Sequence, residues 1–333
     1  MSRDSVEPGI PGPSGTLGRI MAQRIVATAY GDPAEVLEIV DEEPPRPGPG
    51  QVLVETKAIG VNPADAKIVR GTMGGDESKL PLPIGFEAAG VVSAVGDGAV
   101  LPDGPLTVGD EVIVYRASGA YADRVLADLT VVHRRPESLD VEHAAGLLLV
   151  GVTAADLIGT AGVTADDVVL VHGGSGAVGA ITIQLARTAG ATVIATASAR
   201  NHDHVRGLGA IPVAYGDGLL DRIRDAATAP VTVALDTVGT DEAIDASLAL
   251  VDNPGKIVSV AAFGRASDGI VLVTGSTPES KRLREEAIDG LIADAASGEL
   301  VTEVAKTFPL AEAATALTEL ETSHPRGKFI LIP

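Results

Sequence analysis

The 333-residue sequence contains no cysteine, which excludes disulfides, thiolate zinc sites and a cysteine nucleophile. It also contains no tryptophan and only 4 tyrosines and 4 phenylalanines. A chain of this length is long enough for two domains. Because aromatic residues make up only 2% of it, the core must be built from alanine, valine, leucine and isoleucine.

Basic residues are scarce, since Lys and Arg number 25 against 45 Asp and Glu, and the net charge is −20. Such a charge repels phosphate backbones and anionic lipid, so we expect neither nucleic acid nor a membrane as a partner. No apolar run is long enough to cross a bilayer, and the N-terminus shows no secretory signal. We therefore expect a cytoplasmic protein, in which an anionic cofactor needs local donors.

The stretch 168–197 carries the strongest motif of the chain. A β-branched run at 168–171 is followed by a glycine cluster, an apolar-periodic segment and a second β-branched run at 192–195. This order predicts a strand, a tight turn, a helix and a second strand.

The turn has the spacing Gly174-x-Gly176-x-x-Gly179, with Gly173 before it and Ser175 inside it. In a dinucleotide-binding turn the first glycine makes the sharp bend. The second lets backbone approach a pyrophosphate, and the third lets the helix pack close to the strand. The first helical turn then offers unpaired N–H groups to the phosphates. The alternative is a glycine-rich turn that binds nothing.

Residues 1–20 are rich in Pro, Gly and Ser without periodicity and are expected to be a disordered leader, either an expression remnant or an upstream extension. From 23 to about 128 the pattern is all β, as in a small barrel. Gly, Asp and a Pro-rich connection separate the expected strands, which are 24–28, 36–40, 51–59, 86–95, 111–115 and 121–125.

A helix at 141–158 is expected to cross between domains, and alternating strands and helices follow it. This alternation predicts an α/β, doubly wound parallel sheet of the Rossmann type. Its further helices are expected at 201–208, 218–227 and 241–250, and its further strands at 212–215, 231–236, 255–260 and 270–273. Helices at 279–296 and 310–321 and a strand at 328–332 are expected to return to the first domain. The expected domains are 21–147 with 275–333, and 148–274.

The corner at 196–201, after the second strand of the motif, predicts the cofactor. NAD enzymes carry an acid there, about 20 residues past the first glycine, which holds the ribose 2′-hydroxyl. This chain has no acid there and offers Ser198, Arg200 and Asn201 instead. Because arginine binds a 2′-phosphate bidentately, we predict NADPH over NADH. The alternative is a solvated Arg200 at a helix start and a relaxed cofactor choice.

Six stretches together resemble a known family. They are PGPGQVLVETKAIGVNPADAKIVRG (47–71), PIGFEAAGVVSAVGDG (83–98), VGDEVIV (108–114), GAYADRV (119–125), the VHGGSGAVG turn and GKFILIP (327–333). They are similar to the zinc-independent medium-chain dehydrogenase/reductases of the quinone oxidoreductase branch. The resemblance covers about 21–333 and implies a GroES-like, mainly β barrel domain beside the Rossmann domain.

The zinc alcohol dehydrogenases place a ligand Cys where this chain has Asn62 and a ligand His where it has Phe86, beside Glu87. The resemblance therefore implies no metal. It implies hydride transfer from NADPH to a quinone or to the C=C bond of an activated α,β-unsaturated carbonyl. The alternatives are an enoyl reductase acting on a thioester or biosynthetic intermediate, and a non-catalytic NADPH-binding structural or regulatory dimer.

The resemblance also implies catalytic candidates. Asn62 donates an amide hydrogen bond to the substrate oxygen, Lys67 supplies a proton or offsets charge, and Asp65 orients Lys67. Tyr121 reaches the same pocket with its hydroxyl. The alternatives are a surface pair of Asp65 and Lys67, an Asn62 that only holds the loop, and a Tyr121 that is a half-buried strand aromatic.

Cofactor contacts and a homodimer follow from the same matching. The implied contacts are Thr153 by the nicotinamide, the N–H groups of Ala177 and Val178 at the pyrophosphate, Tyr215 near the adenosine phosphate, Thr237, Val238, Ala261 and Phe263 at the carboxyl ends of strands, and Lys328 as a late contact. Family members commonly pair their last Rossmann strand across a two-fold axis. The apolar strand at 270–273 therefore predicts a homodimer.

Overall fold

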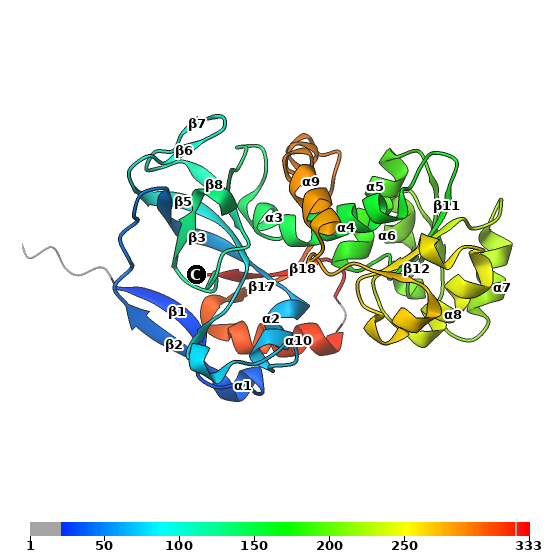
Figure 1. The fold of residues 1–333 in the computed structure, drawn as a ribbon, viewed down its shortest axis with the longest axis horizontal. Helices are drawn as coiled ribbons and strands as arrows, with labels where there is room; N and C mark the ends of the chain where they lie inside the picture. The colour runs from blue at the N-terminus through cyan, green and yellow to red at the C-terminus, as the bar shows by residue number, and fades with distance from the viewer. Residues whose placement is uncertain (1–20, 324) are drawn as a thin grey trace, which may run out of the picture.

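The computed structural model describes residues 21–323 and 325–333. The expected disordered leader, 1–20, lies outside the described residues. Figure 1 shows two bodies side by side, with α4 (Leu148–Ala161) and α9 (Pro278–Ser297) between them. Within the described ranges, none of the helices combines the length and the apolar character that crossing a membrane requires.

The first body is built on a seven-stranded sheet with the order β10-β8-β5-β3-β18-β17, to which β9 adds by pairing with β3. The C-terminal strand pairs antiparallel with β3, with Phe329 opposite Val61, so the tail returns to the first body as expected. The strands are β3 (Gln51–Val61), β5 (Glu87–Val95), β8 (Glu111–Tyr115), β9 (Arg124–Asp128), β10 (Val132–Arg134), β17 (Val304–Pro309) and β18 (Lys328–Ile332).

The first expected hairpin is present, because β1 (Ala22–Ala27) and β2 (Leu37–Glu42) pair antiparallel. The short helix α1 (Pro33–Val36) occupies its turn, where the side chain of Asp32 accepts a hydrogen bond from the Ala34 N–H. The remaining elements of this body are α2 (Pro63–Val69), α10 (Ala313–Ser323), β4 (Leu82–Pro83), β6 (Val100–Leu101), β7 (Gly104–Pro105) and 3-10 turns at Glu77–Lys79, Leu129–Val131 and Leu310–Glu312.

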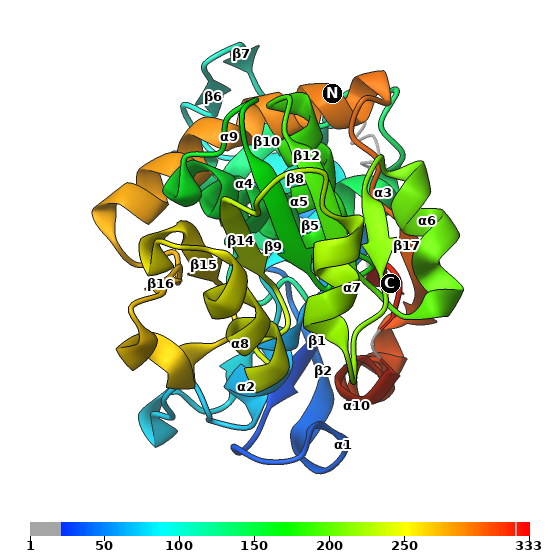
Figure 2. The same cartoon turned by 90° about the vertical axis from the view of Figure 1, so that its right-hand side faces the viewer.

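The second body is the predicted parallel sheet, with the order β13-β12-β11-β14-β15-β16 (Figure 2). All five neighbouring pairs in it are parallel. Its strands are β11 (Val168–His172), β12 (Thr192–Thr196), β13 (Ile211–Val213), β14 (Val233–Asp236), β15 (Ile257–Ser259) and β16 (Val271–Leu272). Its helices are α5 (Ala177–Thr188), α6 (His202–Gly207), α7 (Leu219–Ala226) and α8 (Asp241–Leu250), with 3-10 turns at Ala199–Asn201, Pro254–Lys256 and Phe263–Asp268.

The β-branched run of β11 explains why helices cover both faces of this sheet. Val169 and Val171 pack in a buried cluster with residues of α4, α5 and α6. Val168 and Leu170 pack in another cluster with residues of α7 and α8. Because successive side chains of a strand point to opposite faces, a strand that is apolar at every position needs cover on both.

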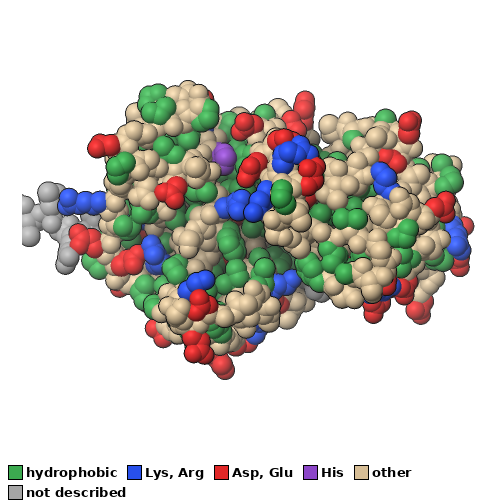
Figure 3. Space-filling view, in the orientation of Figure 1, with side chains coloured by type: hydrophobic (Ala, Val, Ile, Leu, Met, Phe, Trp, Pro, Cys, Tyr) green, Lys and Arg blue, Asp and Glu red, His purple; other side chains and the backbone are tan. Residues whose placement is uncertain are grey.

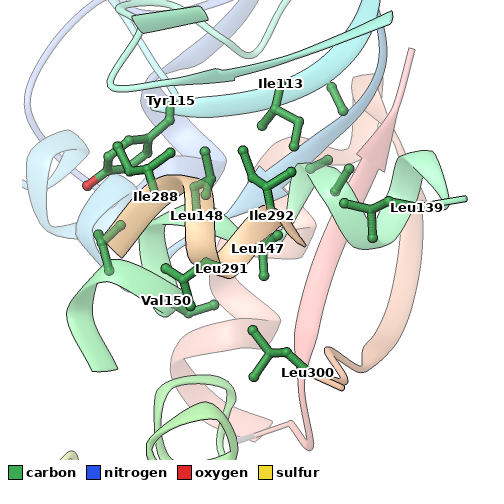
Figure 4. Close-up of a cluster of buried hydrophobic side chains, with 14 of the residues drawn as sticks. Ile113, Tyr115, Leu139, Leu147, Leu148, Val150, Ile288, Leu291, Ile292 and Leu300 are labelled. Atoms are coloured by element: carbon green, nitrogen blue, oxygen red, sulfur yellow. The ribbon is translucent and has the colours of Figure 1, made fainter. Parts of the chain in front are cut away.

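The helix expected at 141–158 is two helices, α3 (Val141–Ala145) and α4. The break falls at Gly146, where a Cβ would lie 3.2 Å from side-chain atoms of Ile330 and Lys328. This close approach to β18 involves residues far away in the chain, so the helical periodicity of the sequence does not reveal the break. Beyond it, α4 and α9 share a cluster with β8, in which Ile113 and Tyr115 face Ile288 and Ile292 (Figure 4).

Two strands also differ from expectation. The strand expected at 121–125 begins only at Arg124, because the Tyr121 N–H bonds to the Ile84 carbonyl and the backbone turns at Ala120–Ala122. The strand β17 was not expected. Its residues from Ala305 to Thr307 are exposed, so it lacks the alternation that identifies a strand.

Candidate functional site

Five polar side chains are buried together where α2, β5 and β18 meet. We call them the buried polar network; the exposed fractions are 0% for Asn62, Asp65, Glu87 and Tyr121 and 4% for Lys328. Buried polar groups are stable only when they are hydrogen-bonded. Their partners therefore decide what each group is free to do.

Lys328 and Glu87 form the ionic half of the network. The Lys328 Nζ lies 2.5 Å from Asn62 Oδ1, 2.9 Å from Glu87 Oε1 and 3.0 Å from the Val61 carbonyl. Asn62 Nδ2 donates to Glu87 Oε1 over 3.1 Å. The second carboxylate oxygen, Glu87 Oε2, accepts the N–H of Leu149 over 2.9 Å at the start of α4. All three ammonium N–H groups are thus matched by acceptors inside the protein.

Asp65 forms the other half. Its Oδ2 accepts hydrogen bonds of 2.9 Å from the Asn62 N–H and from the Tyr121 hydroxyl. Its Oδ1 is buried without a hydrogen-bond partner in the described structure. Burial raises the pKa of Asp65 to about 7; the two hydrogen bonds and the charge of Lys328 oppose this rise, and Glu87 adds to it. Burial also raises the pKa of Tyr121 well above its ordinary value.

These contacts correct three catalytic expectations. Asp65 does not orient Lys67, because residues 63–69 form α2 rather than a loop, and positions two apart on a helix face different sides. Asp65 is buried while Lys67 is exposed. The side chains of Asn62 and Tyr121 form hydrogen bonds inside the network and are not exposed to solvent. The structure therefore favours the alternative in which Asn62 holds its loop, and Tyr121 is a buried residue outside β9.

The glycine turn, residues 173–179, has the expected geometry. Gly173 adopts φ +80°, which favours glycine. A Cβ on Gly174 would lie 2.7 Å from Ala195 Cβ of β12, and one on Gly179 would lie 2.1 Å from the Gly173 carbonyl oxygen. A Cβ on Gly176 would be 3.4 Å from that oxygen, an ordinary contact. Packing within the protein therefore requires glycine at positions 174 and 179 and does not require it at Gly176.

The start of α5 fits a diphosphate. Gly176 precedes Ala177 without a side-chain cap, so the first-turn N–H groups, including those of Ala177 and Val178, have no intrahelical acceptor. Ser175 Oγ accepts a 3.0 Å hydrogen bond from Asn201 Nδ2, which ties the turn to the corner after β12. These donors suit a phosphate group.

The corner and the strand ends hold the other expected cofactor residues. Ser198 is half-buried, and Arg200 is exposed with no ion pair within the described residues. Thr237 Oγ1 donates to the His172 carbonyl over 2.7 Å, and Asp236 Oδ1 accepts the Val238 N–H over 3.1 Å. Three apolar side chains at the carboxyl ends of strands or just beyond are exposed: Tyr215 (60%), Val238 (45%) and Phe263 (50%). Ala261 is half-buried in the same region.

Thr153 and Lys328, two further expected cofactor residues, lie near the start of α4 and in the buried polar network, respectively. Thr153 lies one turn beyond the Glu87-bound end of α4, and its Oγ1 donates to the Leu149 carbonyl over 2.7 Å. The backbone beside Lys328 does approach the turn, since Gly327 forms an isolated bridge with Gly176. The side chain of Lys328, however, points into the buried polar network. The structure therefore does not show the expected position of this ammonium at the cofactor turn.

The surface between the two bodies is hollowed, with apolar side chains along it and Lys or Arg side chains at its rim (Figure 3). Sequence reasoning did not select Glu87, although an acid within the otherwise apolar strand of residues 87–95 was a usable signal. No cluster of three or more metal-binding side chains occurs within the described ranges.

Family models match two stretches of the chain. One is described as an alcohol dehydrogenase GroES-like domain and covers 48–137. The other is described as a zinc-binding dehydrogenase and covers 208–331.

Similar proteins match over nearly the whole chain. A quinone oxidoreductase of Pseudomonas aeruginosa is 33% identical over 94% of this chain and 100% of its own length. An NADPH-dependent alkenal/one oxidoreductase of Arabidopsis thaliana is 29% identical over 85% of this chain and 72% of its own. The solved structure of Escherichia coli quinone oxidoreductase complexed with NADPH superimposes with a TM-score of 0.80 at 29% identity, over 93% of this chain and 100% of the other.

Proposed function

The chain belongs to the medium-chain dehydrogenase/reductase family, among the quinone oxidoreductases, and is an NADPH-dependent oxidoreductase; we propose that its acceptor is a quinone or the C=C bond of an activated α,β-unsaturated carbonyl. When bound, NADPH supplies the hydride. With one proton from a side chain or solvent, the hydride converts a quinone to a hydroquinone or saturates the alkene, and NADP⁺ is released.

The glycine turn supports the cofactor, because it presents N–H groups at the start of α5 beside an arginine corner without an acid, and the similarity to quinone and alkenal/one oxidoreductases supports the acceptor class. The exposed apolar groups at Tyr215, Val238 and Phe263 offer a surface for the rings of a nucleotide. These chain residues bind and orient the cofactor at the edge of the parallel sheet, where ligands of such sheets bind.

Lys67 is the proton donor in this proposal. It is exposed on α2, and no side-chain partner holds its ammonium in the described structure. An ammonium that is free to move can hydrogen-bond the oxygen on which negative charge develops, and electrostatic stabilisation of this type is often the largest catalytic contribution. We expect Lys67→Met to lower kcat more than it raises KM.

We also propose that the reaction uses no zinc. Asn62 and Phe86 offer neither a thiolate nor an imidazole, and the Lys328 ammonium lies between Asn62 Oδ1 and Glu87, where it already neutralises the buried carboxylate. Metal analysis of the purified protein tests this. One tightly held zinc per chain would contradict it.

The function is tested by following NADPH oxidation with a panel of quinones, enones and enoyl thioesters. Turnover of quinones or enones supports the proposal, and turnover of thioesters alone supports the enoyl reductase alternative. NADPH binding without turnover on any acceptor would favour a non-catalytic binding protein.

We further propose a homodimer in the cytoplasm, joined through β16. This strand is the edge of the parallel sheet, so its outer backbone groups pair with no further strand within the described residues and can pair with those of a second copy. A monomeric mass by light scattering at micromolar concentration would contradict the dimer.

A further inference from the structure

Arg116 has a backbone conformation unlike that of any other non-glycine residue in the described ranges. It directly follows β8 and adopts φ +67°, in the left-handed region. This region is unfavourable for a residue with a Cβ, and glycine avoids that cost. Non-glycine residues held there cluster at ligand-binding sites, where the surrounding structure imposes the conformation.

The guanidinium of Arg116 is exposed, and within the described ranges no carboxylate pairs with it. The neighbouring arginines behave differently. Arg284 Nε lies 2.7 Å from Asp156 Oδ2, and Arg124 pairs with Glu55. Like Arg200 and Arg46, Arg116 has no acidic partner within the described residues, although the chain carries 45 acids against 25 bases. Its charge is available to a ligand.

Arg116 lies next to the buried polar network. Tyr115 is opposite Glu87 in the pairing of β8 with β5, and the Ala117 N–H donates to the Phe86 carbonyl over 3.0 Å. Burial raises the pKa of the Tyr115 hydroxyl, and the nearby guanidiniums of Arg284 and Arg116 oppose that rise. Figure 3 shows Lys or Arg side chains at the rim of the hollow, in the region between β8 and α9. The backbone at Arg116 therefore lies beside β5 and the buried polar network, and its exposed guanidinium is available to a group bound nearby.

We propose that Arg116 binds an oxyanion substituent, a carboxylate or sulfonate, on the acceptor, so that the protein selects anionic acceptors over neutral ones. This inference rests on the proposed function. A guanidinium presents paired N–H donors that match the two oxygens of such a group. The overall charge of −20 repels an anionic substrate, so a preference for anionic over neutral acceptors requires a local positive charge.

The test uses acceptor pairs that differ by the anionic group. One pair is β-acetylacrylate and its methyl ester, and the other is naphthoquinone sulfonate and naphthoquinone. We compare the wild type, Arg116→Gln and the matched control Arg46→Gln, since Arg46 is also exposed and unpaired within the described structure but lies in the Pro-rich connection before β3. Thermal unfolding of each variant verifies that it folds.

We expect Arg116→Gln to lower kcat/KM for the anionic member of each pair by ~10–100-fold, mainly through KM, because a charge-assisted hydrogen bond is lost. The neutral members should change by less than about 2-fold, because they make no such hydrogen bond. Arg46→Gln should leave both unchanged. Equal effects of Arg116→Gln on the anionic and neutral members of a pair would overturn the inference, and so would a wild type that does not prefer the anionic members. In either case, turnover of the neutral members would still support the proposed function. No turnover of any acceptor would overturn both.

Discussion

Lys328 Nζ lies 2.9 Å from Glu87 Oε1, and the two side chains, from strands 241 positions apart in sequence, are 4% and 0% exposed. This pair joins the first β sheet to its returning C-terminal strand. Through Glu87 Oε2 and the Leu149 N–H it also holds the start of α4, the helix that leads into the parallel sheet. The pair therefore connects the two bodies as well as closing one of them.

Removing the ammonium should be severely destabilising. Lys328→Met leaves the Glu87 carboxylate buried without its counter-charge, and breaking a buried ion pair in this way costs about 3–5 kcal/mol. Urea denaturation measures the change in the free energy of unfolding. Arg282→Met, which breaks only exposed pairs on α9, should leave it unchanged within error. The double variant Lys328→Met with Glu87→Gln should recover part of the loss, and no recovery would mean that charge is not the cause.

Asp65 should make stability depend on pH. Its pKa is about 7 in the folded protein against an ordinary value of 3.8, so the folded state keeps a proton that the unfolded state releases. The unfolded state then binds fewer protons between these values, and stability should fall as pH rises from 3.8 to about 7. The full effect is on the order of 4 kcal/mol for a shift of this size.

Asp65→Asn removes this titrating group, so its unfolding free energy should lack that slope when compared with wild type across the same pH range. Tyr121→Phe is the informative second variant. The Tyr121 hydroxyl lowers the pKa of Asp65 by hydrogen bonding, so its removal should shift the pH window upward. A slope that persists unchanged in Asp65→Asn would show that another group causes it.

Arg200 should determine cofactor preference. Arg200→Ala removes the expected partner of the 2′-phosphate and should raise KM for NADPH by ~10–100-fold, the size of a lost charge-assisted contact, with a smaller effect for NADH. Steady-state kinetics with both cofactors measure the ratio. Arg206→Ala is the control, since Arg206 lies on the following helix and pairs with Asp203. Equal effects of Arg200→Ala on KM for both cofactors would contradict a role of Arg200 in binding the 2′-phosphate.

Gly179 should not tolerate a side chain. Gly179→Ala places a Cβ 2.1 Å from a backbone oxygen of Gly173, so the turn or α5 must move. We expect a loss of NADPH affinity of at least ~10-fold by calorimetry, because misplaced N–H groups no longer meet the phosphates. Gly290→Ala is the matched control, because a Cβ there meets nothing within 4 Å. It should stabilise α9 by roughly 0.5–1 kcal/mol, since alanine is the better helix former.

The candidate site was only partly predictable. The glycine spacing and the absence of an acid at the corner after β12 are local features, and a short window of sequence contains them in full. The roles of Asn62, Asp65 and Lys328 depend on contacts with residues far away in the chain. The resemblance assigned Asn62 to the substrate, Asp65 to the orientation of Lys67 and Lys328 to the cofactor, while the structure places all three in the buried polar network.

The sequence by itself determined the parallel sheet and its cofactor turn, because apolar runs of a given period must be buried and glycine alone fits the close approaches. Only the tertiary structure decided where helices break and which charges are free. Gly146 ends a helix because β18 passes beside it, and Arg116 adopts a left-handed backbone because the chain must turn away after β8. Those constraints come from neighbours distant in sequence, and no local pattern records them.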